Sequence, residues 1–524
     1  MGKVLKYRIR PEIGLNEQKL DQFLKSKWSK SGVPPTYLLK KRSIDARKSK
    51  PMVEIEVELF ENGEPFPKPT YQKPDQLKEG QNELIIIGSG PAGLFAALKC
   101  LEMGVKPIIL ERGNDVRARR RDLANINKKH LVNPESNYCF GEGGAGTYSD
   151  GKLYTRSKKR GDVQRVLELL VAHGAAADIL VDTHPHIGTN QLPKVVSEMR
   201  KTILSRGGEI HFNTKVTDLM LKNGAVSGVV LAGGHKIEAS GVIICTGHSA
   251  RDIYRMLDAH NIHIEAKPFA LGVRIEHPQE IIDGIQYHCN DRGPYLPAAS
   301  YALATQTRIN KNERGVFSFC MCPGGFIVPA ATENGEVVVN GMSPSKRDSK
   351  YANSGMVVAI NLEDLNDYSK YGAFAAMEFQ AQIERKACIV AGGDQTAPAQ
   401  RMQDFVDKKI SQSLPDCSYQ PGLSSSDLNV VLPQEIHERL RAGLKTFGKK
   451  LSSYLTNEAV LVGVESRTSS PVKIPRNRDT FEHEQVARLY PCGEGAGYAG
   501  GIVSAAIDGE KCAEAFAHKY CKVK

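Results

Sequence analysis

The sequence of 524 residues contains no Cys-x-x-Cys pair, although it has 11 cysteines. That absence counts against redox proteins that relay electrons through such a pair and against a structural zinc site, so we expect no metal. The odd number of cysteines, scattered without a framework, fits a reducing compartment better than a disulfide scaffold. The closest pair, Cys320 and Cys322, would form a strained disulfide in an extended strand.

Long hydrophobic runs are also missing. No stretch approaches the roughly 18 apolar residues needed to cross a bilayer. Hydrophobic residues make up 41% of the chain and charged residues 25%, near the averages of globular proteins. Residues 1–11 alternate basic and apolar side chains and lack the apolar core of a secretory signal. We therefore expect a cytoplasmic protein that does not span a membrane.

Positive charge is concentrated at the start of the chain. The net charge is +11, and residues 1–50 hold 14 Lys or Arg against 4 Asp or Glu, a net of +10. The same region predicts a small α+β domain, with an extended segment at 7–10, a helix at 16–28 and strands at 37–44 and 53–60. The Pro-rich residues 61–78 predict a stiff linker after it.

From Glu83 onward the chain alternates strand and helix, which is typical of a parallel sheet covered on both faces. The apolar strand at 84–87 runs into Gly88-Ser89-Gly90-Pro91-Ala92-Gly93 and a helix that ends near residue 103. Gly88 permits a tight turn, Gly90 lets the backbone approach a pyrophosphate, and Gly93 lets the helix pack on the strand. This order predicts a Rossmann-type dinucleotide site.

The predicted helix begins at Pro91 and Ala92 and directs its amides and positive dipole end at the phosphates. The next apolar strand, at 105–110, ends at Glu111, which Arg112 follows. A carboxylate there accepts ribose hydroxyls and repels a 2′-phosphate. The sequence therefore predicts FAD or NAD rather than NADP.

A second glycine-rich stretch, CFGEGGAGTYSDGK at 139–152, matches the same pattern. No apolar strand precedes it and turn residues follow it, so we do not interpret it as another dinucleotide site. We expect its backbone amides, including those near Gly144 and Thr147, to face a cofactor bound nearby. The alternative is a plain surface loop.

Residues 217–221, 226–231 and 236–239 predict an antiparallel meander, after which an apolar strand reaches Thr246-Gly247. Near the C-terminus, ARLYPCGEG at 487–495 and Gly500-Gly501-Ile502 lead into a helix. This arrangement resembles the glutathione-reductase superfamily of FAD proteins, in particular its fumarate-reductase-like branch, over about residues 80–260 and 460–520.

The resemblance implies FAD and names further cofactor contacts. Val216 and Thr246-Gly247 match positions that touch adenine and pyrophosphate. Glu494, after Gly493, matches an acidic position near the ribityl chain and pyrophosphate. The helix that begins near Gly501 would aim its positive end at the flavin N1 and C2 carbonyl.

The predicted fold class is therefore α/β, with a discontinuous Rossmann-type FAD-binding domain that combines a parallel sheet and a meander. It carries an inserted α+β domain and follows a small N-terminal α+β domain. The expected bounds are 1–75 for the basic N-terminal domain and linker, 80–265 and 461–524 for the two parts of the FAD-binding domain, and 266–460 for the inserted substrate or cap domain.

More narrowly, the motifs GGAGTYSDGKL, VIICTGHSARDIY, CMCPGG, VESRTSSPVKIPR and GEGAGYAGGIVSAAIDG resemble an incompletely characterised bacterial family of FAD-dependent or NAD(FAD)-utilising dehydrogenases. FAD is expected to bind non-covalently, because the loop at 141–151 lacks the histidine that some fumarate-reductase relatives use. A second fingerprint for NAD(P)H is absent from the sequence. Either a nicotinamide reductant binds transiently or the reductant is another compound.

Four residues are catalytic candidates, each with a competing explanation. Lys152 would stabilise a reduced flavin or an anionic substrate, or else be solvated. His186 would transfer a proton near neutral pH, or else pack in its loop. Cys322, with Cys320, would present a thiol to the flavin, or else be inert. Arg467 would hold a substrate carboxylate in its planar fork, whereas the competing account is a structural ion pair around Glu465.

Two main functions follow, and a non-enzymatic FAD sensor is a third alternative. The leading one is an FAD-dependent oxidoreductase that transfers hydride to or from a small organic substrate in the inserted domain. The alternative is a flavoprotein of RNA modification whose basic N-terminal domain binds nucleic acid through residues such as Lys40, Lys41 and Arg42. The sequence leaves the oligomeric state open.

Overall fold

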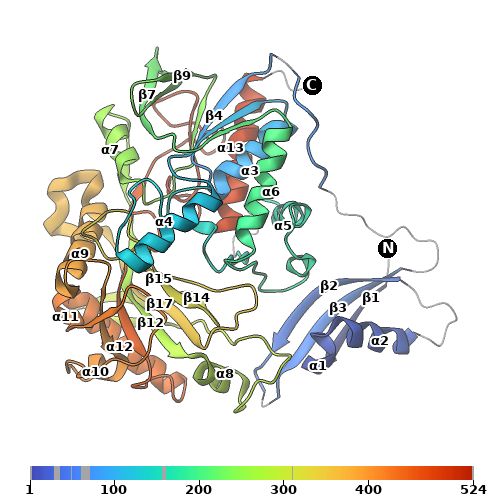
Figure 1. Ribbon diagram of the computed structural model, residues 1–524, viewed down its shortest axis with the longest axis vertical. Coiled ribbons are helices and arrows are strands. Elements are labelled where there is room, and N and C mark those ends of the chain that lie inside the picture. Colours follow the sequence, from blue (N-terminus) through green and yellow to red (C-terminus); the bar gives the residue numbers. More distant parts are fainter. Residues whose placement is uncertain are drawn as a thin grey trace.

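A computed structural model describes residues 3–28, 36–48, 50–60, 71–78, 80–155, 161–309 and 311–521 (Figure 1). Two large α/β parts lie against each other, and a small N-terminal part, blue in Figure 1, lies to one side. Most of the predicted Pro-rich linker, residues 61–70 and 79, falls outside the described residues. Residues 71–78 run without helix or strand.

The N-terminal part is a three-stranded antiparallel sheet of order β1-β3-β2 with two helices. Leu20 and Leu24 of the longer helix are buried with Val53 and Ile55 of the central strand. This confirms the predicted helix and strands to within a few residues. The elements are β1 (Lys3–Ile9), α1 (Pro11–Gly14), α2 (Glu17–Trp28), β2 (Thr36–Asp45) and β3 (Met52–Phe60).

The predicted parallel sheet has five strands in the order β22-β10-β4-β5-β6, and every neighbouring pair is parallel. The strands are β4 (Glu83–Ile87), β5 (Lys106–Leu110), β6 (Glu209–His211), β10 (Val242–Ile244) and β22 (Leu489–Pro491). The C-terminal strand β22 therefore joins the edge of a sheet that begins some 400 residues earlier in the chain. The C-terminal segment therefore returns to the sheet that contains β4.

Both faces of this sheet are covered, because successive side chains of a strand point to opposite faces. Leu84 and Ile86 of β4 pack with the helices on one face, and Ile85 and Ile87 pack with the meander and α7 on the other. The helices and short 3-10 turns of this part are α3 (Pro91–Glu102), α4 (Val116–Lys129), η2 (Gly144–Gly146), α5 (Val163–Ala172), η4 (Ala177–Leu180), α6 (Leu192–Ser205), α7 (Arg251–Ala259) and α13 (Ile502–Tyr520). The meander is antiparallel, of order β7-β8-β9, with β7 (Val216–Lys222), β8 (Ala225–Leu231) and β9 (Lys236–Glu238).

The second large part is built on a seven-stranded sheet of order β13-β14-β17-β12-β20-β18-β19, in which all pairs but β18 and β19 are antiparallel. Its strands are β12 (Phe269–Pro278), β13 (Ala304–Ile309), β14 (Asn312–Cys322), β17 (Tyr351–Ile360), β18 (Ala397–Arg401), β19 (Leu423–Ser425) and β20 (Val460–Glu465). Two small ribbons, β11 (Glu265–Ala266) with β21 (Val472–Lys473) and β15 (Phe326–Pro329) with β16 (Val339–Met342), complete the strands. The helices are α8 (Gln279–Tyr287), η5 (Leu362–Phe374), α9 (Ala375–Ala391), α10 (Met402–Val406), α11 (Leu428–Val431) and α12 (Gln434–Lys450).

The boundary expected at residue 461 falls inside β20. Val460–Glu465 pairs with β12 and β18 of the seven-stranded sheet, so by strand pairing this strand belongs to the inserted domain. The apolar run that looked like the start of the second nucleotide-binding segment is a central strand of the other sheet. We place the boundary after Glu465. None of the helices that the structure describes combines the length and apolar character needed to cross a membrane.

Candidate functional site

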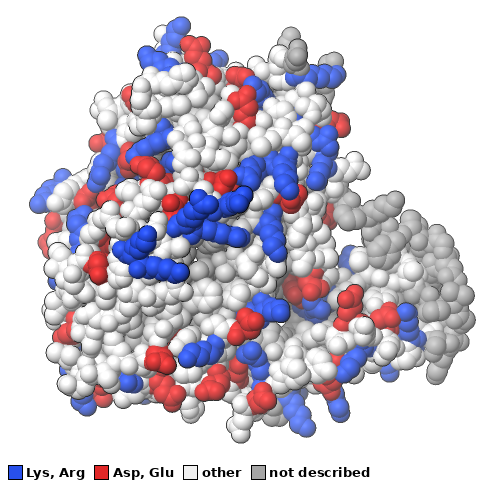
Figure 2. Space-filling model, in the orientation of Figure 1, with Lys and Arg blue, Asp and Glu red and all other residues white. Residues whose placement is uncertain are grey.

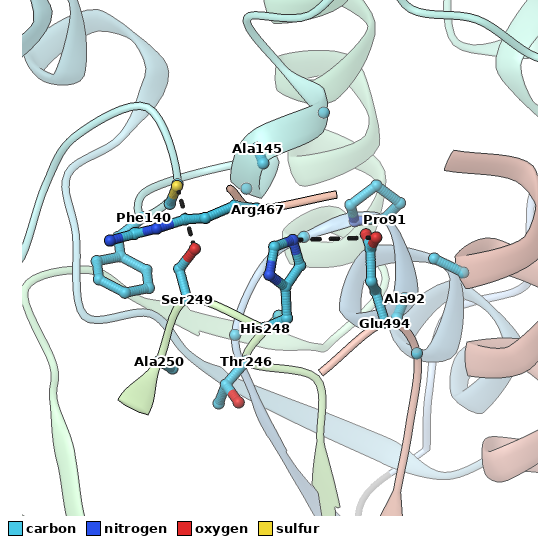
Figure 3. A pocket seen from close by; sticks show the side chains of 18 of the residues that line it. Pro91, Ala92, Phe140, Ala145, Thr246, His248, Ser249, Ala250, Arg467 and Glu494 are labelled. Carbon is cyan, nitrogen blue, oxygen red and sulfur yellow. Dashed lines mark hydrogen bonds and ion pairs between the residues drawn. The ribbon is translucent and has the colours of Figure 1, made fainter. Parts of the chain in front are cut away.

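One cavity of about 440 Å³ lies where the parallel sheet meets the seven-stranded sheet. Its walls come from the loop after β4, the loop that contains η2, the start of α13 and the ends of β14 and β20. Phe319, Cys320 and Glu465 of the inserted domain line the same cavity as residues of the nucleotide-binding part, several of which are labelled in Figure 3. A ligand held by the first part would therefore meet the second.

The turn from β4 to α3 has the tight packing that its glycines predict. A Cβ added at Gly93 would lie 2.0 Å from the carbonyl oxygen of Gly88, so only glycine lets α3 start this close to the strand. At Gly90 the nearest atom to an added Cβ is 3.9 Å away, on Gly144. No side chain caps the N-terminus of α3, and Pro91 and Ala92 line the cavity.

A second helix N-terminus opens into the cavity. Gly501 is the N-cap of α13, it has no side-chain cap, and it lines the cavity together with Gly500 and Ile502. A Cβ added at Gly500 would meet no atom within 4 Å. Two uncapped helix N-termini thus offer free amides and positive dipole ends to one space.

Glu111 is buried at the end of β5 and accepts four hydrogen bonds. Its Oε2 accepts from the amide and hydroxyl of Ser89, at 2.9 and 2.8 Å. Its Oε1 accepts from the amides of Gly113 and Gly141, at 2.9 and 3.0 Å. Glu111 therefore ties the two glycine loops to the strand, and a ribose hydroxyl would have to replace one of these donors or share an oxygen with it.

Glu494 and His248 face each other across the cavity in Figure 3, with Glu494 Oε1 3.9 Å from His248 Nε2. Burial raises the pKa of Glu494 to about 7. Burial, with the positive charge of Arg467, lowers the pKa of His248 to about 4. The Nδ1 atom of His248 is buried without a hydrogen-bond partner in the described structure. His248 is therefore neutral at pH 7 and has an unused polar atom.

The predicted cofactor residues converge on this cavity with two exceptions. Those that line it are Gly88, Gly90, Pro91, Ala92, Glu111, Arg112, Gly144, Val216, Thr246, Gly247, Gly493, Glu494, Gly500, Gly501 and Ile502. Gly93 instead packs α3 on β4, and Thr147 donates from its hydroxyl to the carbonyl oxygen of Glu142 at 2.9 Å. Arg112 also pairs with Glu135 and Asp252 at 2.6 and 3.0 Å.

The structure separates the four catalytic candidates. Lys152 lines the cavity. His186 does not: it sits behind Lys152, in a β-bridge with it, and its Nε2 lies 3.0 Å from the carbonyl oxygen of Ser345. Cys322 is fully buried behind the cavity wall, and its neighbour Cys320 lines the wall instead. The loop-packing explanation therefore suits His186 better than a catalytic one.

Arg467 lines the cavity (Figure 3), but its guanidinium is held by acidic partners. It bonds to Glu384 through Nε and Nη2, at 3.1 and 2.9 Å, and to Glu336 at 3.0 Å. Arg251 bonds to the same two glutamates, at 2.7 Å to Glu336 and 2.6 Å to Glu384. The structural ion pair considered as the alternative for this region is present, but its carboxylates come from Glu384 and Glu336. Glu465 pairs with Arg274 instead, at 2.5 Å.

Sequence reasoning missed His248 on the cavity wall and ranked Cys322 ahead of Cys320, which lines that wall. His248 follows Thr246-Gly247 directly, so its position beside two predicted cofactor contacts was a usable signal. Cys320 was considered only with Cys322, as part of an extended strand. Its backbone is instead left-handed, with φ of 46°, and the pairing of β14 shifts register between Phe319 and Cys322. No local sequence pattern announces this bulge.

The cavity offers the hydrogen-bond donors and the free space that FAD requires. The free amides of two helix N-termini suit a pyrophosphate and an electron-rich ring edge. Open space at Gly500 and the unpartnered Nδ1 of His248 leave room and polar contacts for a bound group. Fold and site thus define an α/β protein with a parallel sheet and a second domain that shares its cavity.

Comparison with known proteins agrees with this class. Residues 268–468 match the family described as "FAD-dependent protein, C-terminal domain-like". An uncharacterized protein of Clostridium beijerinckii is 42% identical over 497 residues, which is 92% of each chain. The chain belongs to the same family as this protein, and the match at 268–468 supports a family of flavoproteins.

Two more distant proteins are also similar. Thiamine thiazole synthase of Methanococcus vannielii is 28% identical over 179 residues, 32% of this chain and 57% of that protein. The crystal structure of CtdE in complex with FAD covers 84% of both chains, with 12% identity and a TM-score of 0.32. A TM-score this low is too weak to carry an argument. The support for FAD comes from the family and from the cavity.

Proposed function

We propose that this protein is an FAD-dependent oxidoreductase of the glutathione-reductase superfamily that binds FAD non-covalently and acts on a small organic substrate. The observation that carries the proposal is the single cavity into which two uncapped helix N-termini open beneath the inserted domain. Family membership supports the flavin. The inserted domain supplies the wall that a substrate would contact.

The chain's own residues suggest how FAD is held. The amides at the start of α3, after Gly90, would take the pyrophosphate. Val216 would touch the adenine, and the start of α13 at Gly501 would stabilise negative charge on the isoalloxazine ring. When bound, FAD supplies the two-electron redox chemistry, and the protein orients the substrate and manages protons.

Proton management falls to the groups around the cavity. Glu494, with its pKa raised to about 7, exchanges a proton near neutral pH, as a general acid or base requires. His248 stays neutral and offers its nitrogens as a donor and an acceptor. Lys152 brings a positive charge to the part of the wall that Cys320 of the inserted domain forms. The site thus combines an anion-stabilising charge with a titratable carboxyl group.

The test begins with the purified protein. We expect the purified protein to show flavin absorbance bands. After acid precipitation the flavin should remain in the supernatant as free FAD, which shows non-covalent binding. Anaerobic stopped-flow mixing with NADH, NADPH and a panel of reduced metabolites should then bleach the flavin with at least one compound faster than free FAD is bleached. A protein that neither copurifies with FAD nor takes it up on reconstitution would sink the proposal.

The surface of the structure that best suits nucleic acid is not the basic N-terminal domain that the sequence indicated. Basic residues of the N-terminal part form ion pairs, including Lys6 with Glu56, Lys40 with Glu58 and Arg42 with Asp182. Figure 2 instead shows Lys and Arg gathered along α4. Within the described residues, none of the exposed side chains of Arg117, Arg120, Arg121, Lys128 and Lys129 has an ion-pair partner. If the protein binds a polyanion, α4 is the surface that suits it.

A further inference from the structure

Two cysteines of the inserted domain meet one lysine of the nucleotide-binding part. The Nζ atom of Lys152 lies 3.6 Å from the Sγ of Cys320 and 3.5 Å from the Sγ of Cys322. Both sulfurs contact the same ammonium, and the thiol of Cys322 also donates to the carbonyl oxygen of Cys320 at 3.3 Å. The two residues are thus a pair in space as well as in sequence.

A second cation lies on the other side of the pair. The guanidinium of Arg274 is fully buried, and its Nη2 lies 3.6 Å from the Sγ of Cys322 and 2.8 Å from the carbonyl oxygen of Cys320. Arg274 is held in place by Glu465, at 2.5 Å. The other charges at the site are Asp150, 3.7 Å from Lys152 Nζ, and Arg347, which pairs with Asp150 at 2.7 Å.

The charges stabilise one thiolate in the pair. The hydrogen bond from Cys322 lowers the pKa of Cys320 well below its usual value, and Lys152 and Arg274 lower it further. The same hydrogen bond, together with burial, raises the pKa of Cys322. For comparison, burial is the largest influence on Cys100 and Cys388, and it raises the pKa of both thiols. The charges therefore favour the thiolate form of Cys320, whereas Cys322 favours the thiol form and donates to the carbonyl oxygen of Cys320 at 3.3 Å.

The backbone conformation places one thiol on the cavity wall and the other in the protein interior. The left-handed conformation of Cys320 and the register shift after Phe319 break the extended strand. Cys320 is exposed on the cavity wall, while Cys322 is completely buried behind it. A nucleophile that faces a cavity, backed by a second sulfur within reach, is the arrangement that thiol–disulfide exchange needs.

We propose that Cys320 and Cys322 are a redox-active thiol pair whose substrate is a small disulfide bound in the cavity. Cys320 is the attacking thiolate and Cys322 is the resolving thiol. The inference rests on the proposed function only in assigning the cavity as the substrate site, because the exchange itself needs no flavin.

The exchange balances in two steps. The Cys320 thiolate attacks one sulfur of a disulfide R–S–S–R, forming a mixed disulfide as the old S–S bond breaks and the first RS⁻ leaves, to be protonated by solvent. Cys322 then gives up its proton and attacks the Cys320 sulfur, which expels the second RS⁻, and this thiolate takes the proton. The substrate is reduced to two thiols, and the pair is oxidised by two electrons to a Cys320–Cys322 disulfide.

The test uses an aromatic disulfide, 5,5′-dithiobis(2-nitrobenzoate), with the purified full-length protein. We expect a burst that releases two thiolates per chain, after which peptide mass spectrometry finds Cys320 joined to Cys322 and no adduct on either. The burst should be at least about tenfold faster near pH 7 than the reaction of Cys289, a partly exposed cysteine that does not line the cavity, because the rate follows the thiolate fraction.

Variants separate the roles of the two sulfurs and the lysine. Cys322→Ser should release one thiolate in the burst and keep the adduct on Cys320, and Cys320→Ser should abolish the burst. Lys152→Met should slow the burst, and Lys152→Arg should restore most of it. A stable adduct on Cys320 in the wild type, or a Cys320 no faster than Cys289, would overturn the inference. A burst in protein that does not bind FAD would leave it standing and sink the proposed function alone.

Discussion

Glu384 Oε2 lies between two guanidinium groups, 2.9 Å from Arg467 Nη2 and 2.6 Å from Arg251 Nη2. All three side chains are buried. Burial alone would raise the pKa of Glu384, but the two arginines outweigh it and hold that pKa well below its usual range. This cluster joins α9, which carries Glu384, and the segment after β20, which carries Arg467, to α7 of the nucleotide-binding part.

Arg467→Met should therefore act first on stability. It leaves two buried glutamates with one buried arginine, and breaking a buried pair costs about 3–5 kcal/mol of unfolding free energy. The measurement is urea denaturation. The matched control is Arg255→Met, an exposed arginine 3.2 Å from Glu378, which should cost less than about 1 kcal/mol. If Arg467 served the substrate alone, its variant would keep wild-type stability and raise only KM.

Two glycines of the same turn should respond in opposite ways to alanine. Gly93→Ala puts a Cβ 2.0 Å from the Gly88 carbonyl oxygen, so α3 must shift, and we expect about 1–3 kcal/mol of destabilisation. Gly90→Ala meets its nearest neighbour at 3.9 Å, so the fold should lose less than about 1 kcal/mol.

If the pyrophosphate approaches the backbone at Gly90, the Gly90→Ala protein should bind FAD about tenfold more weakly, which corresponds to about 1.4 kcal/mol. Flavin fluorescence titration of the apoprotein measures this, and thermal unfolding of both variants supplies the stability. Unchanged FAD affinity in Gly90→Ala would place the pyrophosphate elsewhere.

Glu494 predicts a pH dependence of stability. Its pKa is raised from the ordinary 4.5 to about 7, so the folded state favours the protonated form. The cost of ionising it in the folded protein is absent below pH 4.5 and grows until about pH 7. Glu494→Gln should therefore match the wild type at low pH and be more stable than it above pH 7 when the cavity is empty. Urea denaturation of the apoproteins across this range measures it; parallel curves would contradict the assignment.

The basic row on α4 predicts where any polyanion binds. If RNA binds at all, the double variant Arg120→Glu with Arg121→Glu should weaken it and reduce the slope of log affinity against log salt by about two. Lys41→Glu, an exposed position of the N-terminal part, should have a smaller effect if α4 is the surface. Fluorescence anisotropy with single-stranded RNA at two salt concentrations distinguishes them. The absence of salt-sensitive binding in the wild type would end the nucleic-acid alternative.

The sequence by itself determined the nucleotide-binding half. The apolar run before Gly88, the glycine spacing and the meander are local patterns, and local patterns decide the period of a strand and the start of a helix. These patterns predicted β4, α3 and the three meander strands close to their observed bounds. They also predicted that the C-terminal segment returns to the same sheet, which β22 does.

Only the tertiary structure decided what surrounds the cavity on the other side. The sequence of Val460–Glu465 is typical of a buried strand in either sheet. Only its pairing with β12 and β18 shows to which sheet it belongs. Arg467 is committed to Glu384, 83 residues away in sequence, and Lys152 meets Cys322 across 170 residues. Contacts of such separation leave no periodic signal in the sequence, because each depends on how whole domains pack. The glycine loops of the flavin side were therefore readable from the chain, and so were Cys320 and Cys322 as candidates, but their contacts with Lys152 were not.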